Sequence, residues 1–95
     1  MYLVISVWEP LPGKEQQFRE HGMKVGAELK KQPGVQMLEV MESGGKVVSV
    51  HGYTDEATYR RVVEDPNGPF AQSLSNLRLE DYGRWLSSER GETIA

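Results

Sequence analysis

The sequence predicts one α+β domain of the ferredoxin-like, split βαβ type, with a four-stranded antiparallel sheet and helices on one face. Two observations predict this class. Segments rich in β-branched and aromatic residues alternate with amphipathic helical patterns, in the order strand, helix, strand, strand, helix, strand. Right-handed βαβ crossovers then bring both helical layers to the same face of the sheet. The opposite face is left without helices.

The first strand and the first helix are marked by their periodicity and by proline. The run YLVISVW at residues 2–8 has the composition of a strand, and Pro10 and Pro12 follow it because proline cannot extend the hydrogen-bonded ladder. Residues 13–32 carry small or apolar side chains at helical spacing, and Pro33 ends this pattern. The positions that form this stripe are Phe18, Gly22, Val25 and Leu29.

Residues 35–42 and 46–53 are predicted to form a β-hairpin. The segment SGG at 43–45 favours a turn, and a three-residue loop would pair Glu42 with Lys46. Residues directly opposite each other share a face of the sheet. This register places Met41 opposite Val47, Glu39 opposite Ser49, Met37 opposite His51 and Val35 opposite Tyr53.

A second helix is predicted over residues 56–65. Thr54 or Asp55 can cap its first turn, and Pro66 ends it. Residues 69–75 follow as a short helix with proline in its first turn.

The last strand is predicted at residues 77–86, LRLEDYGRWL, where apolar and polar residues alternate. Residues 87–95 are polar and are expected to form a frayed tail. The folded domain is therefore expected to comprise residues 1–86.

Alternation along the first strand sorts its side chains into two sets. Leu3, Ile5 and Val7 are aliphatic and are expected to face the helices. The helix-free face is then expected to hold Tyr2, Val4, Ser6, Trp8, Val35, Met37, Glu39, Met41, Val47, Ser49, His51 and Tyr53. This area is too apolar for water, so a second copy is expected to cover it in a homodimer with facing sheets. The polar members are expected to line a small hydrated ligand cavity.

Composition excludes several classes of function. The chain has 95 residues, no cysteine and a net charge of −3, with 11 Lys and Arg scattered along it. The lack of cysteine excludes disulfides and thiolate metal sites and is typical of a reducing cytoplasm. Scattered basic residues disfavour nucleic-acid binding. Without a signal-peptide pattern, or an apolar run near the ~20 residues of a membrane helix, a cytoplasmic protein with no membrane contact is expected.

Three stretches of sequence resemble one known family. VWEPLPGKEQQF, QPGV and HGYTDEATYRRVVEDPNGPF are similar to the antibiotic biosynthesis monooxygenase family, across roughly residues 1–86. The resemblance implies a homodimeric α+β barrel, with a pocket between sheet and helices in each subunit. It implies oxygenation of phenolic or quinol-like aromatic substrates by dioxygen without metal, flavin or haem. Other branches of the family degrade haem, and many members have no known activity.

The residues of the haem-degrading branch are not reproduced. That branch uses an Asn late in the first strand, a Trp in the second helix and a His in the short helix. Here the strand offers Ser6, and residues 56–65 and 69–75 contain neither Trp nor His. Haem degradation is therefore not expected. The Asn, Trp, Tyr and Arg set of the aromatic oxygenases is not clearly matched either, so no catalytic role is transferred.

His51 is the leading catalytic candidate. An imidazole with an ordinary pKa of about 6.5 can accept a proton near neutral pH, and Glu39, diagonal to it in the predicted hairpin, would hold the ring and stabilise its charge. Such a base would remove a phenolic or activated C–H proton and leave a carbanion that can pass an electron to dioxygen. The alternative is a hydrogen-bonded histidine that lines a dimer core.

Further residues are expected to bind a substrate. Aromatic rings would form the walls of a site for a planar ligand, and Phe70 would close its mouth. The aromatic residues Trp8, Tyr53, Tyr82 and Trp85 have a structural alternative in the core or at an interface, and Phe70 has one as a helix staple. The expected substrate-binding residues are Ser6, Trp8, Met37, Ser49, Tyr53, Phe70, Tyr82 and Trp85.

No metal or cofactor site is predicted. Two distant histidines and no cysteine leave only scattered carboxylates as ligands, and SGGK at 43–46 is a hairpin turn rather than a phosphate loop. The leading hypothesis is a cofactor-independent, monooxygenase-like enzyme that acts on a small aromatic or quinol-type compound. The alternatives are a non-catalytic small-molecule-binding or assembly domain, and an isomerase or decarboxylase on the same scaffold.

Overall fold

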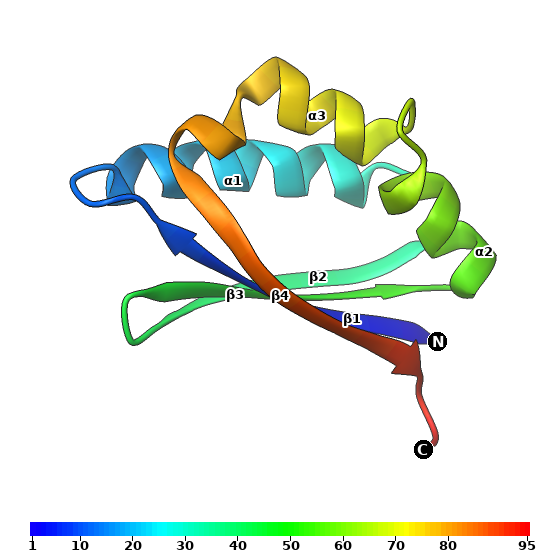
Figure 1. Cartoon of the computed structure of the whole chain (residues 1–95). Helices are drawn as coiled ribbons and strands as arrows, with labels where there is room; N and C mark the ends of the chain where they lie inside the picture. Colours follow the sequence, from blue (N-terminus) through cyan, green and yellow to red (C-terminus); the bar gives the residue numbers. More distant parts are fainter.

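The computed structural model describes residues 1–95 and has one antiparallel sheet with helices on one face (Figure 1). The predicted fold class is confirmed. The elements in chain order are β1 (Tyr2–Pro10), α1 (Glu15–Lys30), β2 (Val35–Ser43), β3 (Lys46–Tyr53), α2 (Glu56–Tyr59), a π-helical segment (Arg60–Glu64), α3 (Pro69–Leu77), a 3₁₀ turn (Leu79–Asp81) and β4 (Gly83–Glu92).

The strand order is β2-β3-β1-β4, and every neighbouring pair is antiparallel. α1 and α3 form a layer over one face of this sheet (Figure 1). α1 packs on β2, whereas α3 packs mainly on α1 and the π-helical segment. None of the helices is both long and apolar enough to cross a lipid bilayer.

α1 forms where it is predicted and buries the predicted stripe. Phe18, Val25 and Leu29 are all nearly inaccessible to solvent. Their spacing places them on one side of the helix, facing the sheet. Leu38 of β2 packs directly against the backbone of Gly26, so α1 lies close to the sheet at this point.

The second helix begins at a predicted cap. Asp55 Oδ1 accepts hydrogen bonds from the backbone N–H of Thr58 at 2.8 Å and from its hydroxyl at 2.7 Å. After one α-helical turn the chain widens into the π-helical segment. Tyr59 and Val62 stay buried through this change. The helix predicted over residues 56–65 is therefore confirmed in position.

The register predicted for the hairpin is wrong by one residue. The turn contains two residues, Gly44 and Gly45, with φ angles of 57° and 78°, and Ser43 pairs with Lys46. A two-residue turn with positive φ at both positions matches the twist of the strands, and glycine adopts that conformation at low cost.

This shift changes which β2 side chains share a face with His51. Leu38, rather than Met37, lies opposite His51, and Glu39 lies opposite Val50. Met37, Glu39 and Met41 consequently belong to the helix-free face. The predicted pair of Val35 with Tyr53 is present, because a register shift before Met37 restores it.

Side chains of β1 and β3 are grouped as predicted, but the grouped set faces the helices. The cross-strand pairs are Tyr2–Tyr53, Val4–His51, Ser6–Ser49 and Trp8–Val47. Tyr2 packs on Tyr59 with ring centroids 5.3 Å apart, and Trp8 packs on Phe18 at 5.8 Å. The expected sides were wrong because aromatic rings, rather than the aliphatic set, fill the space beneath the helices.

The helix-free face is still apolar, with different residues. β1 contributes Leu3, Ile5 and Val7, and β3 contributes Val48 and Val50. All five side chains are partly accessible, and Ile5 is 40% exposed. The sequence-based argument for a covering partner therefore applies to this set.

The prediction for the last strand and the tail was wrong. Residues at 77–81 finish α3 and form the 3₁₀ turn, after Arg78 takes a left-handed φ of 52°. β4 runs on to Glu92, and the backbone N–H of Thr93 donates to the carbonyl of Met1. The polar residues from 87 are ordered because β1 is long enough to pair with them along its whole length.

Candidate functional site

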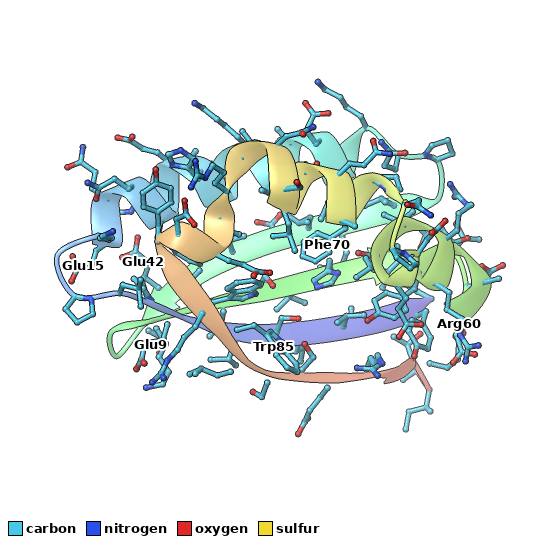
Figure 2. All side chains as sticks on the ribbon, turned by 45° about the horizontal axis from the view of Figure 1, so that its top comes forward. Glu9, Glu15, Glu42, Arg60, Phe70 and Trp85 are labelled. Atoms are coloured by element: carbon cyan, nitrogen blue, oxygen red, sulfur yellow. The ribbon has the colours of Figure 1, made fainter.

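A cavity of about 1040 Å³, here called the central cavity, lies between the sheet and the helices. It is present because α3 rests on α1 and the π-helical segment rather than on the sheet. Phe70 projects from α3 and Trp85 lies on β4 at its border (Figure 2). The cavity expected between two facing sheets was therefore misplaced. The pocket implied by the family resemblance, between sheet and helices, is the one observed.

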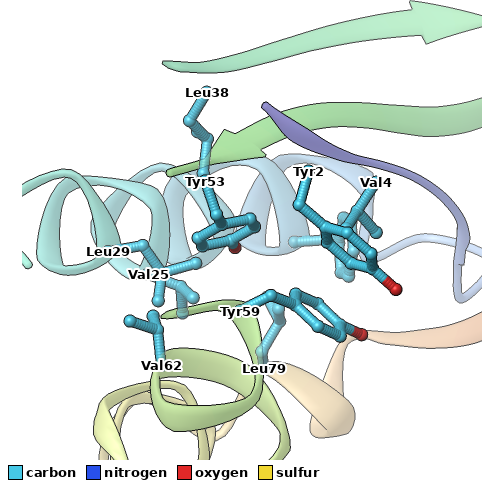
Figure 3. Packing of buried hydrophobic residues seen from close by; sticks show 10 residues of the cluster. Tyr2, Val4, Val25, Leu29, Leu38, Tyr53, Tyr59, Val62 and Leu79 are labelled. Atoms are coloured by element: carbon cyan, nitrogen blue, oxygen red, sulfur yellow. The ribbon is translucent and has the colours of Figure 1, made fainter. Parts of the chain in front are cut away.

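The interior has a packed half and an open half. The packed half is filled by Tyr2, Val4, Tyr53 and Val62, none of which lines the cavity (Figure 3). Tyr59 closes its border and lies 5.4 Å from Tyr53 between ring centroids. The open half is the end lined by Ser6, Trp8, Ser49, Trp85 and Ser88.

His51 lies where the two halves meet. Its ring is only 7% exposed and lines the central cavity. Its Nδ1 is 2.6 Å from the hydroxyl oxygen of Tyr53, and the two rings meet edge to face. Burial lowers the pKa of His51 from 6.5 to about 4, so the imidazole is neutral at neutral pH.

Tyr53 is the buried partner of this imidazole. Its side chain is 0% exposed, and burial, followed by the neighbouring Tyr59, raises the pKa of its hydroxyl well above 10. The hydroxyl therefore keeps its proton at neutral pH. Tyr53 and His51 form a neutral, hydrogen-bonded pair that ends at the cavity.

The floor of the open half contains a second polar chain. The indole Nε1–H of Trp85 donates to Ser88 Oγ at 2.9 Å, and Ser88 Oγ is 2.8 Å from Ser6 Oγ. Ser6 is almost completely buried. These hydroxyls keep a hydrogen-bonding surface beneath an otherwise aromatic wall.

Charged side chains border the cavity at both edges of the sheet. At the β2 edge Arg19 of α1 contacts Glu42 through two nitrogen–oxygen pairs at 2.6 and 2.9 Å. At the β4 edge the guanidinium carbon of Arg90 lies 5.9 Å from the centre of the Tyr59 ring. The cavity thus has an ion pair at one side and an unpaired cation at the other.

The structure brings together seven of the predicted site residues. Those that line the central cavity are Ser6, Trp8, Ser49, His51, Phe70 and Trp85, together with Glu39 at its open edge. Tyr53 lies behind His51 rather than in the cavity wall. Tyr82 stacks on His21 outside the cavity, with ring centroids 4.5 Å apart.

Two of the predicted residues lie on the helix-free face. Met37 pairs with Gly52 and does not line the cavity. Glu39 borders the open edge of the cavity, but it is exposed and pairs with Val50. The expected contact between Glu39 and His51 is not formed, because the hairpin register differs by one residue.

Other cavity residues were not predicted. Phe18 and Tyr59 come from the helices, and their place on the buried stripes was the available signal. Ser88 and Arg90 were missed because the last strand was placed before them.

Solved structures of bacterial proteins have a similar fold. SnoaB, a cofactor-independent oxygenase from Streptomyces nogalater, superposes with a TM-score of 0.78 at 14% identity, covering 99% of this chain and 93% of its own. Rv0793 from Mycobacterium tuberculosis gives 0.80 at 13% identity, covering 99% and 95%. A structure described as an antibiotic biosynthesis monooxygenase gives 0.79 at 11% identity, covering 100% of both chains.

The chain has the antibiotic biosynthesis monooxygenase fold. No protein-family model matches the sequence, and no curated protein matches it either. At these identities the similarity establishes the fold alone, so the chemistry of this chain has to be argued from its own side chains.

No group of three or more His, Asp or Glu side chains is arranged to hold a metal ion. His21 and His51 lie apart, on the outer side of α1 and on β3. The site offers an imidazole, hydroxyls and aromatic rings, with the guanidiniums of Arg19 and Arg90 and several carboxylates at its edges.

Proposed function

We propose that this protein is a cofactor-independent, monooxygenase-like enzyme that acts on a small aromatic or quinol-type compound. The observation that carries the proposal is the neutral imidazole of His51 at the floor of an aromatic-walled cavity within one chain. Aromatic walls suit a planar substrate, and a few converging polar groups orient it. SnoaB, which shares the fold, is a cofactor-independent oxygenase, and this supports the reaction type.

The cavity volume supports the size of the substrate. About 1040 Å³ is near the upper end of ordinary small-molecule sites. Trp8, Phe18, Phe70 and Trp85 all border it, so the rings of a substrate can contact several aromatic side chains. A compound of two to four fused rings fits this space better than a single ring.

The proposed chemistry begins with the anion of the substrate. An activated CH₂ group next to phenolic rings loses a proton to solvent water and leaves a carbanion, which passes one electron to dioxygen. The resulting radical and superoxide combine to form a C–O bond and a peroxide. Protonation and loss of water then leave a carbonyl, so that CH₂ and O₂ become C=O and H₂O. His51 lines the cavity, and in this proposal its imidazole contacts the oxygen of the substrate during this sequence.

Oxygen consumption tests this proposal. Purified protein is mixed with a panel of anthrones and quinols, and oxygen uptake is followed with an electrode. We expect uptake above the uncatalysed rate with at least one tricyclic compound, and loss of most of that rate in His51→Ala. His21→Ala is the matched control because His21 stacks on Tyr82 outside the cavity. Equal rates in both variants would contradict the proposal.

A non-catalytic ligand-binding domain is the second candidate. It is favoured by one observation: Glu39 lies on the other face, so no carboxylate is hydrogen-bonded to His51. In that case the protein binds a planar aromatic compound without consuming oxygen. Isothermal titration with the same panel, run beside the oxygen electrode, distinguishes the two functions.

We further propose that two copies form a homodimer through their helix-free sheet faces. Leu3, Ile5, Val7, Val48 and Val50 form a continuous apolar surface there, which is unusual for a monomer in water. Light scattering after gel filtration should give twice the mass of one chain. Ile5→Glu should yield monomers, whereas Met23→Glu on the exposed side of α1 should not. A wild-type monomer at micromolar concentration would contradict this proposal.

A further inference from the structure

The hydrogen bond that His51 makes through Nδ1 determines whether its other ring nitrogen, Nε2, carries a proton. Nδ1 contacts the Tyr53 hydroxyl at 2.6 Å. The other ring nitrogen, Nε2, makes no hydrogen bond within the chain. Every side-chain nitrogen or oxygen that is buried does have a hydrogen-bond partner, so Nε2 is not among the buried atoms. Nε2 is therefore accessible, and the surface that reaches it is the central cavity that His51 lines.

The direction of the hydrogen bond follows from the burial of Tyr53. Its hydroxyl is 0% exposed, and its hydrogen bond to another side chain is the one with His51. If Nδ1 carried the proton and donated it, the hydroxyl proton would have no acceptor, and a buried unpaired donor is costly. The hydroxyl therefore donates, Nδ1 accepts, and a neutral imidazole must carry its proton on Nε2.

The surroundings of Tyr53 hold this arrangement in place. Tyr59 packs against its ring at 66° between ring planes, and Leu38, Val25 and Leu29 lie around it (Figure 3). A ring enclosed in this way cannot turn its hydroxyl to another partner without disturbing the packed half.

We infer that Tyr53 is a positioning residue that fixes His51 as a hydrogen-bond donor, through Nε2–H, so that the cavity selects ligands presenting an acceptor oxygen such as a phenolate, an enolate or a quinone carbonyl. This inference rests on the proposed function for the aromatic class of ligand. It changes the role expected from the sequence, because Nε2 donates a hydrogen bond instead of accepting a proton. Arg90 at the cavity edge adds a positive charge that favours an anionic oxygen.

Nuclear magnetic resonance tests the fixed tautomer directly. In protein labelled with nitrogen-15, long-range proton–nitrogen spectra distinguish the protonated ring nitrogen from the unprotonated one. We expect His51 in the wild type to show a single form with the proton on Nε2, and Tyr53→Phe to show exchange between both forms. Tyr2→Phe is the matched control, since Tyr2 belongs to the same cluster but neither lines the cavity nor makes a hydrogen bond to His51.

Binding of two probes tests the ligand class. 4-Nitrophenol is partly ionised at neutral pH and its phenolate is coloured, whereas 4-nitroanisole has the same ring with a methyl ether. We expect the wild type to bind 4-nitrophenolate about tenfold more tightly than 4-nitroanisole, the effect of one hydrogen bond to a charged oxygen. Tyr53→Phe should lose most of this preference, and Tyr2→Phe should keep it.

Each outcome bears on the inference separately from the proposed oxygenase activity. A wild-type spectrum with the proton on Nδ1 overturns the inference, even if Tyr53→Phe does not fold. Equal binding of both probes, or binding of neither, overturns the ligand class. If no compound causes oxygen uptake while the tautomer and the probe preference are as expected, the oxygenase proposal fails and the inference about His51 holds.

Discussion

The packed half and the open half of the interior lie under the same helices but are filled differently. In the packed half Tyr53 and Val62 are both 0% exposed, and rings meet rings. In the open half the central strands present Ser6 and Ser49, and the space above them is empty enough to form the central cavity. Small hydroxyl residues on the helix-covered face of the sheet therefore lie where the packed core ends and the central cavity begins.

The difference also explains why His51 is placed between them. A histidine wholly within the packed half would need both ring nitrogens satisfied by protein groups. At the boundary one nitrogen is held by the buried Tyr53 and the other makes no hydrogen bond within the chain, on a ring that lines the cavity. The packed half supplies rigidity, and the open half supplies access.

The two halves should differ most in how much stability is lost when one of two neighbouring valines is truncated. Val62→Ala removes a fully buried side chain from the packed half and should lower the free energy of unfolding by about 2–3 kcal/mol. Val63→Ala, in the same segment but lining the cavity, should cost less than about 1 kcal/mol. Urea denaturation measures both variants. Equal losses would mean that the halves do not differ in packing.

Acid should lower the free energy of unfolding because His51, at the boundary between the halves, is buried in its neutral form. Its pKa is about 4 in the folded protein and 6.5 when unfolded, so the unfolded chain gains a proton first as the pH falls. Between about pH 8 and pH 5 this should remove about 2 kcal/mol of stability, with the loss levelling off below about pH 4. His51→Gln should lack this component in denaturation curves recorded across the range. An identical pH dependence in both proteins would show that the ring is not desolvated.

Filling the open half should reduce binding more than stability. Ser49→Leu places extra carbon atoms in the cavity, so the affinity for 4-nitrophenol should fall about tenfold, or about 1.4 kcal/mol, while the unfolding free energy changes by less than that. Ser75→Leu, on an exposed position of α3, is the control. Unchanged affinity in Ser49→Leu, measured by absorbance titration, would place the ligand elsewhere.

The smallest effect is expected from the serine chain. Ser88→Ala removes the acceptor for Trp85 Nε1–H and the partner of Ser6, but Trp85 is 56% exposed and can bond to water. The loss of stability should be about 1 kcal/mol or less. Tryptophan fluorescence during denaturation reports it, with Ser87→Ala as control. A loss above about 2 kcal/mol would show that the serine chain contributes substantially to the stability of the fold.

Much of the fold could be predicted from the sequence because its signals are local. Pro33 and Pro66 end helices, Asp55 caps one, and the stripe through Phe18 and Leu29 sets the buried side of α1. The grouping of Tyr2, Val4, Ser6 and Trp8 on one face of β1 also followed from alternation alone. Each of these inferences depends on a few neighbouring residues.

The site was harder to predict because it depends on small differences of register and on which face is covered. SGG can form a loop of two or three residues. The loop length decides whether Glu39 or Leu38 lies on the same face of the sheet as His51. The aliphatic set of β1 looked like a core, but the helices cover the aromatic and polar set instead. Neither decision is fixed by the composition of a single strand.

β4 contains one irregularity that affects how the sequence should be compared with others. Leu86 has no partner in β1, because Val7 pairs with Ser87 and Trp8 pairs with Trp85. The inward and outward positions of the strand are thus in opposite phase before and after Leu86. An alignment that runs through this point without a gap will match cavity-facing positions with outward-facing ones in any relative that lacks the extra residue. Conservation at this wall should be scored as two separate frames, residues 83–85 and residues 87–92.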